Sequence, residues 1–299
     1  MADHHQPPQS ACAQAACWEK IDAVVCINLD RRADRWASFC ANVPAALPLE
    51  KICRMSAVEG IKLPGYGQAP WFTERTGQRS RYWGGVAGCT LSHVKAIRLA
   101  QQKGWRNLLI LEDDIGVQCS TEALGLLQRA LETAKGQWLL YLGYSGRPYG
   151  TRLAQEGEAA LWQIEGALTT HAYIVPESMY QPLLAALPPD EASVWEWLSI
   201  HRAIDTFYKD EVAAWSGVTV YALQPHIFYQ NGMSGDLATG TGGAPIACAP
   251  PRELRGLRGL VRRLFAPLRR LKTRLNSIRT HRRARAGGFP GYRKKRPQP

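Results

Sequence analysis

The stretch Asn107–Asp114, Asn-Leu-Leu-Ile-Leu-Glu-Asp-Asp, restricts the possible folds more than any other part of the chain. Its four consecutive apolar residues, Leu108–Leu111, are typical of a strand that is buried on both faces of a parallel or mixed sheet. The three carboxylates that follow cannot lie inside such a sheet, so we expect them where the strand emerges at its carboxyl end. In open α/β sheets, ligands bind in the crevice outside these strand ends.

The three carboxylates Glu112, Asp113 and Asp114 are adjacent and would repel one another without a counter-charge. Hard divalent cations with oxygen ligands supply such a charge. The stretch therefore predicts a metal site that holds a phosphate-bearing ligand. The alternative is an acidic loop in which Asp114 caps the next helix, and these residues alone leave both interpretations open.

Alternating apolar runs and helical patterns along the rest of the chain indicate an α/β layer fold. Strands are predicted at 23–29, 51–58, 108–111, 137–143, 167–175 and 218–223. Helices are predicted at 31–42, 120–134, 176–187 and 194–210, and a further one is expected to follow the glycine stretch 84–88 and continue to about residue 103. Residues 144–165 are expected to form an excursion such as a hairpin. We divide the chain into a disordered N-terminus (1–20), one globular domain (21–250) and a tail (251–299).

The net charge of +12 is a property of the tail rather than of the whole chain. Residues 252–299 contain 17 Lys and Arg against a single acid, Glu253, whereas residues 1–251 contain 20 Lys and Arg against 24 Asp and Glu. The predicted domain is therefore mildly acidic, and the basic character of the protein belongs to its tail.

The eight cysteines form no Cys-x-x-Cys pair, which argues against zinc-ribbon and thioredoxin-like classes. The N-terminal residues show no basic stretch followed by an apolar one, and no run of about 18 apolar residues occurs. These features favour a reducing, cytoplasmic location.

The first predicted strand leads into a turn that carries Asn28, Asp30, Arg32 and Arg35. Asp30 is expected to cap the helix that follows. Arginines at such a turn can pair with a phosphate or stack on a base. The equally weighted alternative is a solvated first helical turn in which arginine pairs with Asp34.

Three further places carry polar residues in predicted functional positions. Glycines 84, 85 and 88 precede a predicted helix that contains Ser92 and His93, and a helix N-terminus of this kind favours an anion. His171 follows two threonines into a strand end, where a structural hydrogen-bonding role is the commoner alternative to ligand binding. Asp205 lies among apolar residues in a predicted helix, which indicates a position facing a cleft.

Together these segments resemble glycosyltransferase family 25, the lipopolysaccharide and procollagen β-galactosyltransferases. The matching pieces are Ile27–Arg32 with Asp34 and Arg35, Gly88–His93, Leu108–Asp114, Thr170–Tyr173, Ile204 with Asp205, and, more weakly, Gln230 with Ser234 and Asp236. They span about residues 22–237, and each is short. One departure is Gly85-Val86-Ala87-Gly88-Cys89, because the family commonly has Gly-Glu-Ile-Gly-Cys there, and this puts the sugar specificity in question.

The resemblance implies a GT-A fold, with a Rossmann-like mixed central sheet flanked by helices. It implies transfer, with inversion, of a sugar from a nucleotide diphosphate sugar, most often UDP-galactose, to a glycan such as lipopolysaccharide. Mn²⁺ or Mg²⁺ would be held by Asp114 with Glu112. Asp205 would be the general base, with Asp190, Glu191, Glu196 and Glu211 as alternatives. The implied donor-binding residues are Asn28, Asp30, Arg32, Arg35, Ser92, His93, Glu112, Asp113 and His171.

The tail has apolar residues at spacings of three and four, from Leu254 to Ile278, with arginine and lysine between them. This pattern is typical of a basic amphipathic helix that lies on an anionic membrane, and we assign the contact to residues 252–285. A lipid-linked acceptor would then be met at the inner face of the membrane. The alternatives are a helix packed on the domain and, least favoured, a tail that binds nucleic acid.

Two other functions remain open from the sequence. The same acidic triplet could serve a nucleotidyltransferase or phosphotransferase on a related sheet. The chain could also be a non-enzymatic adaptor that binds membrane or RNA through its tail.

Overall fold

The computed structural model describes residues 15–43, 46–231, 249–254 and 264–290. Several predictions lie outside these residues: the N-terminus up to residue 14, the weaker family match at Ser234 and Asp236, and the part of the tail pattern at 255–263.

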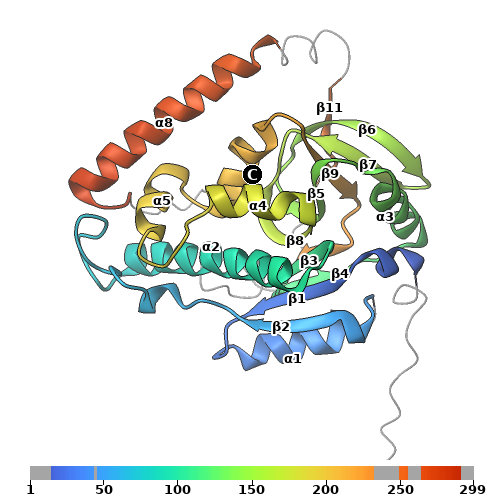
Figure 1. Ribbon diagram of the computed structural model, residues 1–299, viewed down its shortest axis with the longest axis horizontal. Helices are drawn as coiled ribbons and strands as arrows, with labels where there is room; N and C mark the ends of the chain where they lie inside the picture. The colour runs from blue at the N-terminus through green and yellow to red at the C-terminus, as the bar shows by residue number, and fades with distance from the viewer. Residues whose placement is uncertain (1–14, 44–45, 232–248, 255–263, 291–299) are drawn as a thin grey trace, which may run out of the picture.

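The described residues form a mixed α/β structure around a nine-stranded sheet (Figure 1). The strand order is β11-β6-β7-β9-β5-β8-β3-β1-β2. The strands are β1 (Ala23–Asn28), β2 (Ile52–Ser56), β3 (Asn107–Glu112), β5 (Gln137–Ser145), β6 (Tyr149–Glu156), β7 (Ala159–Ile164), β8 (Leu168–Pro176), β9 (Val218–Gln224) and β11 (Arg252–Glu253). A separate antiparallel pair joins β4 (Ile115–Val117) to β10 (Phe228–Gln230). The predicted hairpin is confirmed by the antiparallel pairing of β6 with β7.

Strand β3 lies inside the sheet, as its sequence predicts. It runs parallel to β1 and antiparallel to β8, and Leu108–Leu111 are completely buried. Because β1 also runs parallel to β2, three parallel strands end at the same edge of the sheet. The triplet Glu112–Asp114 is therefore placed at that edge, beside the residues that follow β1 and β2.

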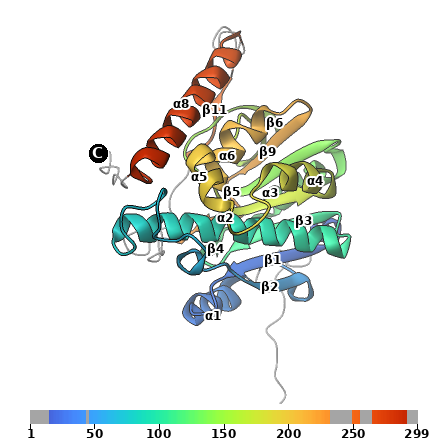
Figure 2. The same cartoon turned by 60° about the vertical axis from the view of Figure 1, so that its left-hand side comes forward.

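Helices cover both faces of the sheet (Figure 2). They are α1 (Ala33–Asn42), α2 (Gln78–Lys103), α3 (Thr121–Thr133), α4 (Glu177–Ala186), α5 (Val194–His201), α6 (Ile204–Asp210) and α8 (Ala266–Gly287). Side chains of α1 and α3 share one core with the sheet, and those of α2, α4, α5 and α6 share the other. Two predicted helix boundaries are confirmed. Ser120 accepts a hydrogen bond from the Ala123 N–H (3.2 Å) at the start of α3, and Gly104 ends α2 in the left-handed conformation.

Helix α2 begins at Gln78, so the prediction that glycines 84, 85 and 88 precede a helix is wrong. They lie inside it because a loop packs directly on its backbone. A Cβ on Gly60 would lie 1.7 Å from the Gly84 carbonyl oxygen, and one on Gly88 would lie 2.3 Å from the Val58 carbonyl oxygen. These glycines allow close packing, and the helix N-terminus that was expected to bind an anion lies elsewhere.

Two further local predictions are wrong. Asp30 does not cap α1; it accepts a hydrogen bond from Ser56 (2.9 Å), and the residue before α1 makes no side-chain cap. The single helix predicted at 194–210 is two helices, α5 and α6, separated at Arg202 by a positive φ of 73°. This break places Asp205 in the first turn of α6.

The tail contributes to the domain at both of its described ends. Strand β11 extends the sheet beside β6, although it belongs to the segment predicted as a tail. At the other end, Phe289 is buried and stacks on Trp83 with ring centroids 4.4 Å apart, while the Ser199 hydroxyl lies 2.6 Å from His281 Nδ1. The end of α8 is thus packed on the domain, as one of the predicted alternatives has it.

The start of α8 is different. Over residues 264–278, which begin two residues before the helix, six apolar side chains are between 47 and 67% exposed: Leu264, Phe265, Leu268, Leu271, Leu275 and Ile278. Together with Leu254, they form the described part of the predicted apolar pattern. Among the described residues, no helix is long and apolar enough to cross a membrane.

Candidate functional site

A cavity of about 480 Å³ lies at the edge of the sheet where β1, β2 and β3 end. Its lining comes from the end of β1 and the start of α1 (Ile27, Leu29, Arg31, Arg35), the loop after β2 (57–61), one side of α2 (Arg81, Gly85, Gly88, Cys89, Ser92, His93), the triplet Glu112–Asp114 and Gln230. The parallel strand ends therefore bring the acidic triplet together with groups from far apart in the sequence.

Asp113 is held in a buried network. Arg35 donates to one of its carboxylate oxygens (2.8 Å), and the Asn28 amide donates to the other (2.6 Å). Arg54 in turn donates to the Asn28 side-chain oxygen at 2.6 Å and 2.9 Å. The Arg35 and Asp113 side chains are each 8% exposed, so these charge-assisted bonds are shielded from water. The network gives Asp113 a positioning role for the triplet.

Asp114 lacks such complete pairing. Its Oδ2 lies 3.5 Å from Arg35 and 3.5 Å from the Gln230 amide, whereas its Oδ1 is buried without a hydrogen-bond partner among the described residues. Burial, and then the nearby charge of Glu112, raise the pKa of Asp114 to about 7. A buried carboxylate oxygen without a donor fits a cation, so the residues present are compatible with the oxygen-ligated metal that the sequence predicts.

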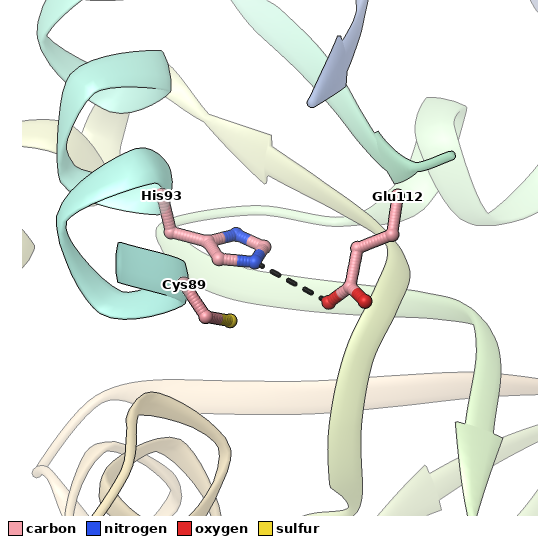
Figure 3. Close-up of side chains that lie close together, drawn as sticks. All are labelled: Cys89, His93 and Glu112. Carbon is pink, nitrogen blue, oxygen red and sulfur yellow. Dashed lines mark ion pairs between the residues drawn. The ribbon is translucent and has the colours of Figure 1, made fainter. Parts of the chain in front are cut away.

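Glu112 points toward His93 on α2 (Figure 3). Its Oε1 lies 3.5 Å from both His93 Nε2 and the Thr170 hydroxyl. Burial alone would raise the pKa of Glu112, but the hydrogen bond and charge of His93 lower it below the ordinary value. Cys89 lies one helical turn before His93, and burial with the Glu112 charge raises the pKa of its thiol. Sulfur, nitrogen and oxygen donors thus meet on one side of the cavity.

Ser92 also lines the cavity, but its hydroxyl is engaged by the backbone. It accepts from the Val58 N–H (2.8 Å) and donates to the Gly88 carbonyl oxygen (2.7 Å). These bonds tie the loop after β2 to α2. The structure therefore shows a positioning contact for Ser92 beside its predicted place in the donor cleft.

Five of the predicted site residues are not among the lining residues of this cavity. Asn28 supports the cavity from behind through its hydrogen bond to Asp113. Asp30 binds Ser56, and Arg32 pairs with Asp34 (2.7 Å), as the solvated alternative has it. His171 is buried, its Nδ1 lies 3.0 Å from the Thr169 hydroxyl, and burial lowers its pKa. Asp205 accepts from the Thr169 N–H (3.2 Å), where the φ of Thr169 is +62°.

The contact between Asp205 and Thr169 is an unusual one. A positive φ is strained for a β-branched residue and is found where surrounding contacts hold it. Asp205 holds the Thr169 N–H, and the next residue, Thr170, lies 3.3 Å from His93. Asp205 therefore orients a segment that contacts the cavity residues.

Sequence reasoning assigned no role to several residues of the cavity and its support, namely Cys89, Thr170, Arg81 and Arg54. Cys89 and His93 carry a readable signal, because residues four apart on a helix share a face. For Arg81 and Arg54 no local pattern distinguishes them from surface arginines.

Comparison with known proteins adds little. No family model matches the chain, and no similar protein was found among curated sequences. Among solved structures, the chain is similar to A197 from STIV (TM-score 0.36, 10% identity, covering 72% of this chain and 87% of that one). It is also similar to mannose-1-phosphate geranyltransferase from Thermus thermophilus (TM-score 0.33, 14% identity, 68% and 74%). Likenesses this weak carry no argument, so function is inferred from the residues of the cavity.

Proposed function

We propose that this protein is a metal-dependent glycosyltransferase of the GT-A type, related to glycosyltransferase family 25. It transfers a sugar, with galactose as the first candidate, from a nucleotide diphosphate sugar to a cell-envelope glycan, with inversion. One observation carries the proposal. The buried Oδ1 of Asp114 has no partner among the described residues, and it lies beside two more carboxylates in a cavity of about 480 Å³ at the sheet edge.

The charge balance of the triplet supports a cation. Three carboxylates face or approach the cavity, and Arg35 contacts two of them. Asp114 with Glu112 would hold Mn²⁺ or Mg²⁺, which acts when bound as a Lewis acid toward a diphosphate leaving group. Arg31 and Arg81 also line the cavity and add positive charge where phosphates would bind. Arg35 and Asn28 hold Asp113 and so keep the triplet in place.

Inversion requires a general base that removes the proton of the acceptor hydroxyl. Asp205 stays the first candidate from the family pattern, although its carboxylate binds the Thr169 backbone. Glu59 is the second candidate because it lines the cavity and its side chain is 23% exposed. The variants Asp205→Asn and Glu59→Gln separate the two. The base is the residue whose change lowers kcat while the affinity for the donor is kept.

The tail supports a membrane-bound acceptor. The exposed apolar side chains of α8 alternate with arginine and lysine, a combination suited to anionic lipid. We propose that residues 252–285 hold the enzyme peripherally on the cytoplasmic face of the inner membrane, near a glycolipid acceptor. Binding of the full chain to anionic vesicles but not to neutral ones tests this proposal.

The decisive experiment measures nucleoside diphosphate release from UDP-galactose and other nucleotide sugars with Mn²⁺ and after chelation. Asp114→Asn is expected to lower turnover by about 100-fold or more, because it removes a charged metal ligand without changing the shape of the side chain. Asp34→Asn, a carboxylate outside the cavity, serves as the control. Unchanged turnover in folded Asp114→Asn contradicts the metal assignment, and release of pyrophosphate instead of UDP favours the nucleotidyltransferase alternative.

A further inference from the structure

We infer that Cys89, His93 and Glu112 form a second metal site, selective for a borderline or soft divalent cation such as Zn²⁺. This site shares Glu112 with the oxygen site proposed on Asp114, but its other two ligands come from α2. It holds whether or not the protein transfers a sugar, since it rests on its own three side chains.

The three donors come together from two elements. Cys89 and His93 are four residues apart on α2, so both side chains project from one face of the helix. Glu112 meets them from the end of β3, and the three side chains point toward one another (Figure 3). The ligand atoms all lie within 4.8 Å of one another, with His93 Nε2 and Glu112 Oε1 3.5 Å apart.

These distances are close to those of a bound ion. Tetrahedral zinc with ordinary bond lengths to sulfur, nitrogen and oxygen holds its ligand atoms about 3.3–3.6 Å apart. The pair His93–Glu112 already has this spacing. The other separations are no more than 4.8 Å, so they exceed this spacing by at most about an ångström, which rotation of the Cys89 side chain can close.

The surroundings of His93 support the assignment. Its Nδ1 lies 3.0 Å from the Tyr173 hydroxyl, which leaves Nε2 directed at Glu112. Metal-bound histidines are commonly oriented in this way by a partner on the other ring nitrogen. The Thr170 hydroxyl lies within 3.5 Å of both His93 and Glu112, and so supports the same pair.

The donor set determines which ion binds. Mg²⁺ and Mn²⁺ prefer oxygen ligands, whereas a thiolate with an imidazole and a carboxylate suits Zn²⁺ or Co²⁺. Three protein ligands leave a fourth position, which is typical of zinc sites that bind water or a substrate oxygen. All three residues line the cavity, so that position is open to a molecule bound there.

The test is a Co²⁺ titration of the reduced full-length chain followed by absorption spectroscopy. A thiolate-bound, tetrahedral Co²⁺ ion gives a sulfur-to-metal charge-transfer band and intense visible bands. We expect one equivalent of Co²⁺ to produce both, Zn²⁺ to displace it, and Cys89→Ser to remove the charge-transfer band. Cys40→Ser, at an exposed cysteine, should keep the band at full intensity.

Asp114→Asn is the variant that separates this inference from the proposed function. It should abolish turnover but retain the sulfur-to-cobalt band at saturating Co²⁺. Absence of the band in the wild-type protein, or its persistence in Cys89→Ser, overturns the inference. A band that is present in a protein that releases no UDP leaves the metal site standing and contradicts only the transferase.

Discussion

Replacing Arg35 by methionine tests whether the acidic triplet depends on a buried counter-charge. Arg35 donates to Asp113 at 2.8 Å and lies 3.5 Å from Asp114, and all three side chains are 8% exposed. Removing one partner of a buried ion pair costs about 3–5 kcal/mol, because the other charge stays buried without compensation. Since Asn28 still donates to Asp113 at 2.6 Å, we expect about 3 kcal/mol.

The assay is urea unfolding at neutral pH, followed by tryptophan fluorescence, for the wild-type protein, Arg35→Met and Arg32→Met. Arg32 lies in the same turn but pairs with Asp34, whose side chain is 59% exposed. Arg32→Met should therefore lower the free energy of unfolding by only a small fraction of the amount expected for Arg35→Met. The double variant Arg35→Met/Asp113→Asn should recover part of the loss, since one unpaired charge is gone. Equal losses at both arginines, or a loss below about 1 kcal/mol at Arg35, would refute the reasoning.

Three other predictions concern stability. Burial lowers the pKa of His226 to about 4, below its value in the unfolded chain. The folded state therefore binds fewer protons than the unfolded state, and the free energy of unfolding falls by about 3 kcal/mol as the pH drops from about 6.5 to 4. His226→Gln should flatten this part of a pH series of urea unfolding. If both proteins show the same slope, His226 is not buried as described. Gly60→Ala should unfold the protein or displace its loop, because the new methyl would lie 1.7 Å from the Gly84 carbonyl oxygen. Gly287→Ala, where a methyl meets no atom within 4 Å, should cost far less in thermal melting. Phe289→Ala should cost about 3 kcal/mol or release the end of α8, which limited proteolysis detects as a new cut; resistance equal to the wild type would contradict the packing on Trp83.

The sequence predicts the sheet better than the contacts made at its edge. The run Leu108–Leu111 has enough apolar surface to require burial on both faces, and the acids after it can lie only at the strand end. The partner of Asp113 is different, because Arg35 is 78 residues away and nothing local relates the two. Pairings of this kind depend on strand order, which short patterns do not determine.

The wrong helix boundaries have a common cause, since packing between distant segments overrides local preference. Glycine is a poor helix former, so Gly84 and Gly88 indicate a helix start, but close contact with Val58 and Gly60 explains their place inside α2. Likewise, the break at Arg202 involves neither glycine nor proline, so the pattern reads through it. Because the break was not predicted, the position of Asp205 in the first turn of α6, bonded to the Thr169 N–H, was not predicted either.

The glycine contact between α2 and the loop after β2 also determines how wide the cavity is on that side. Val58 and Gly60 line the cavity on one side, and Gly88 lines it on the other, with their backbones in direct contact. A methyl group at this seam has no room, so it would force the loop away from α2 or unfold the protein. The width of the cavity on this side is therefore set by two backbones in contact, and no side chain can adjust it.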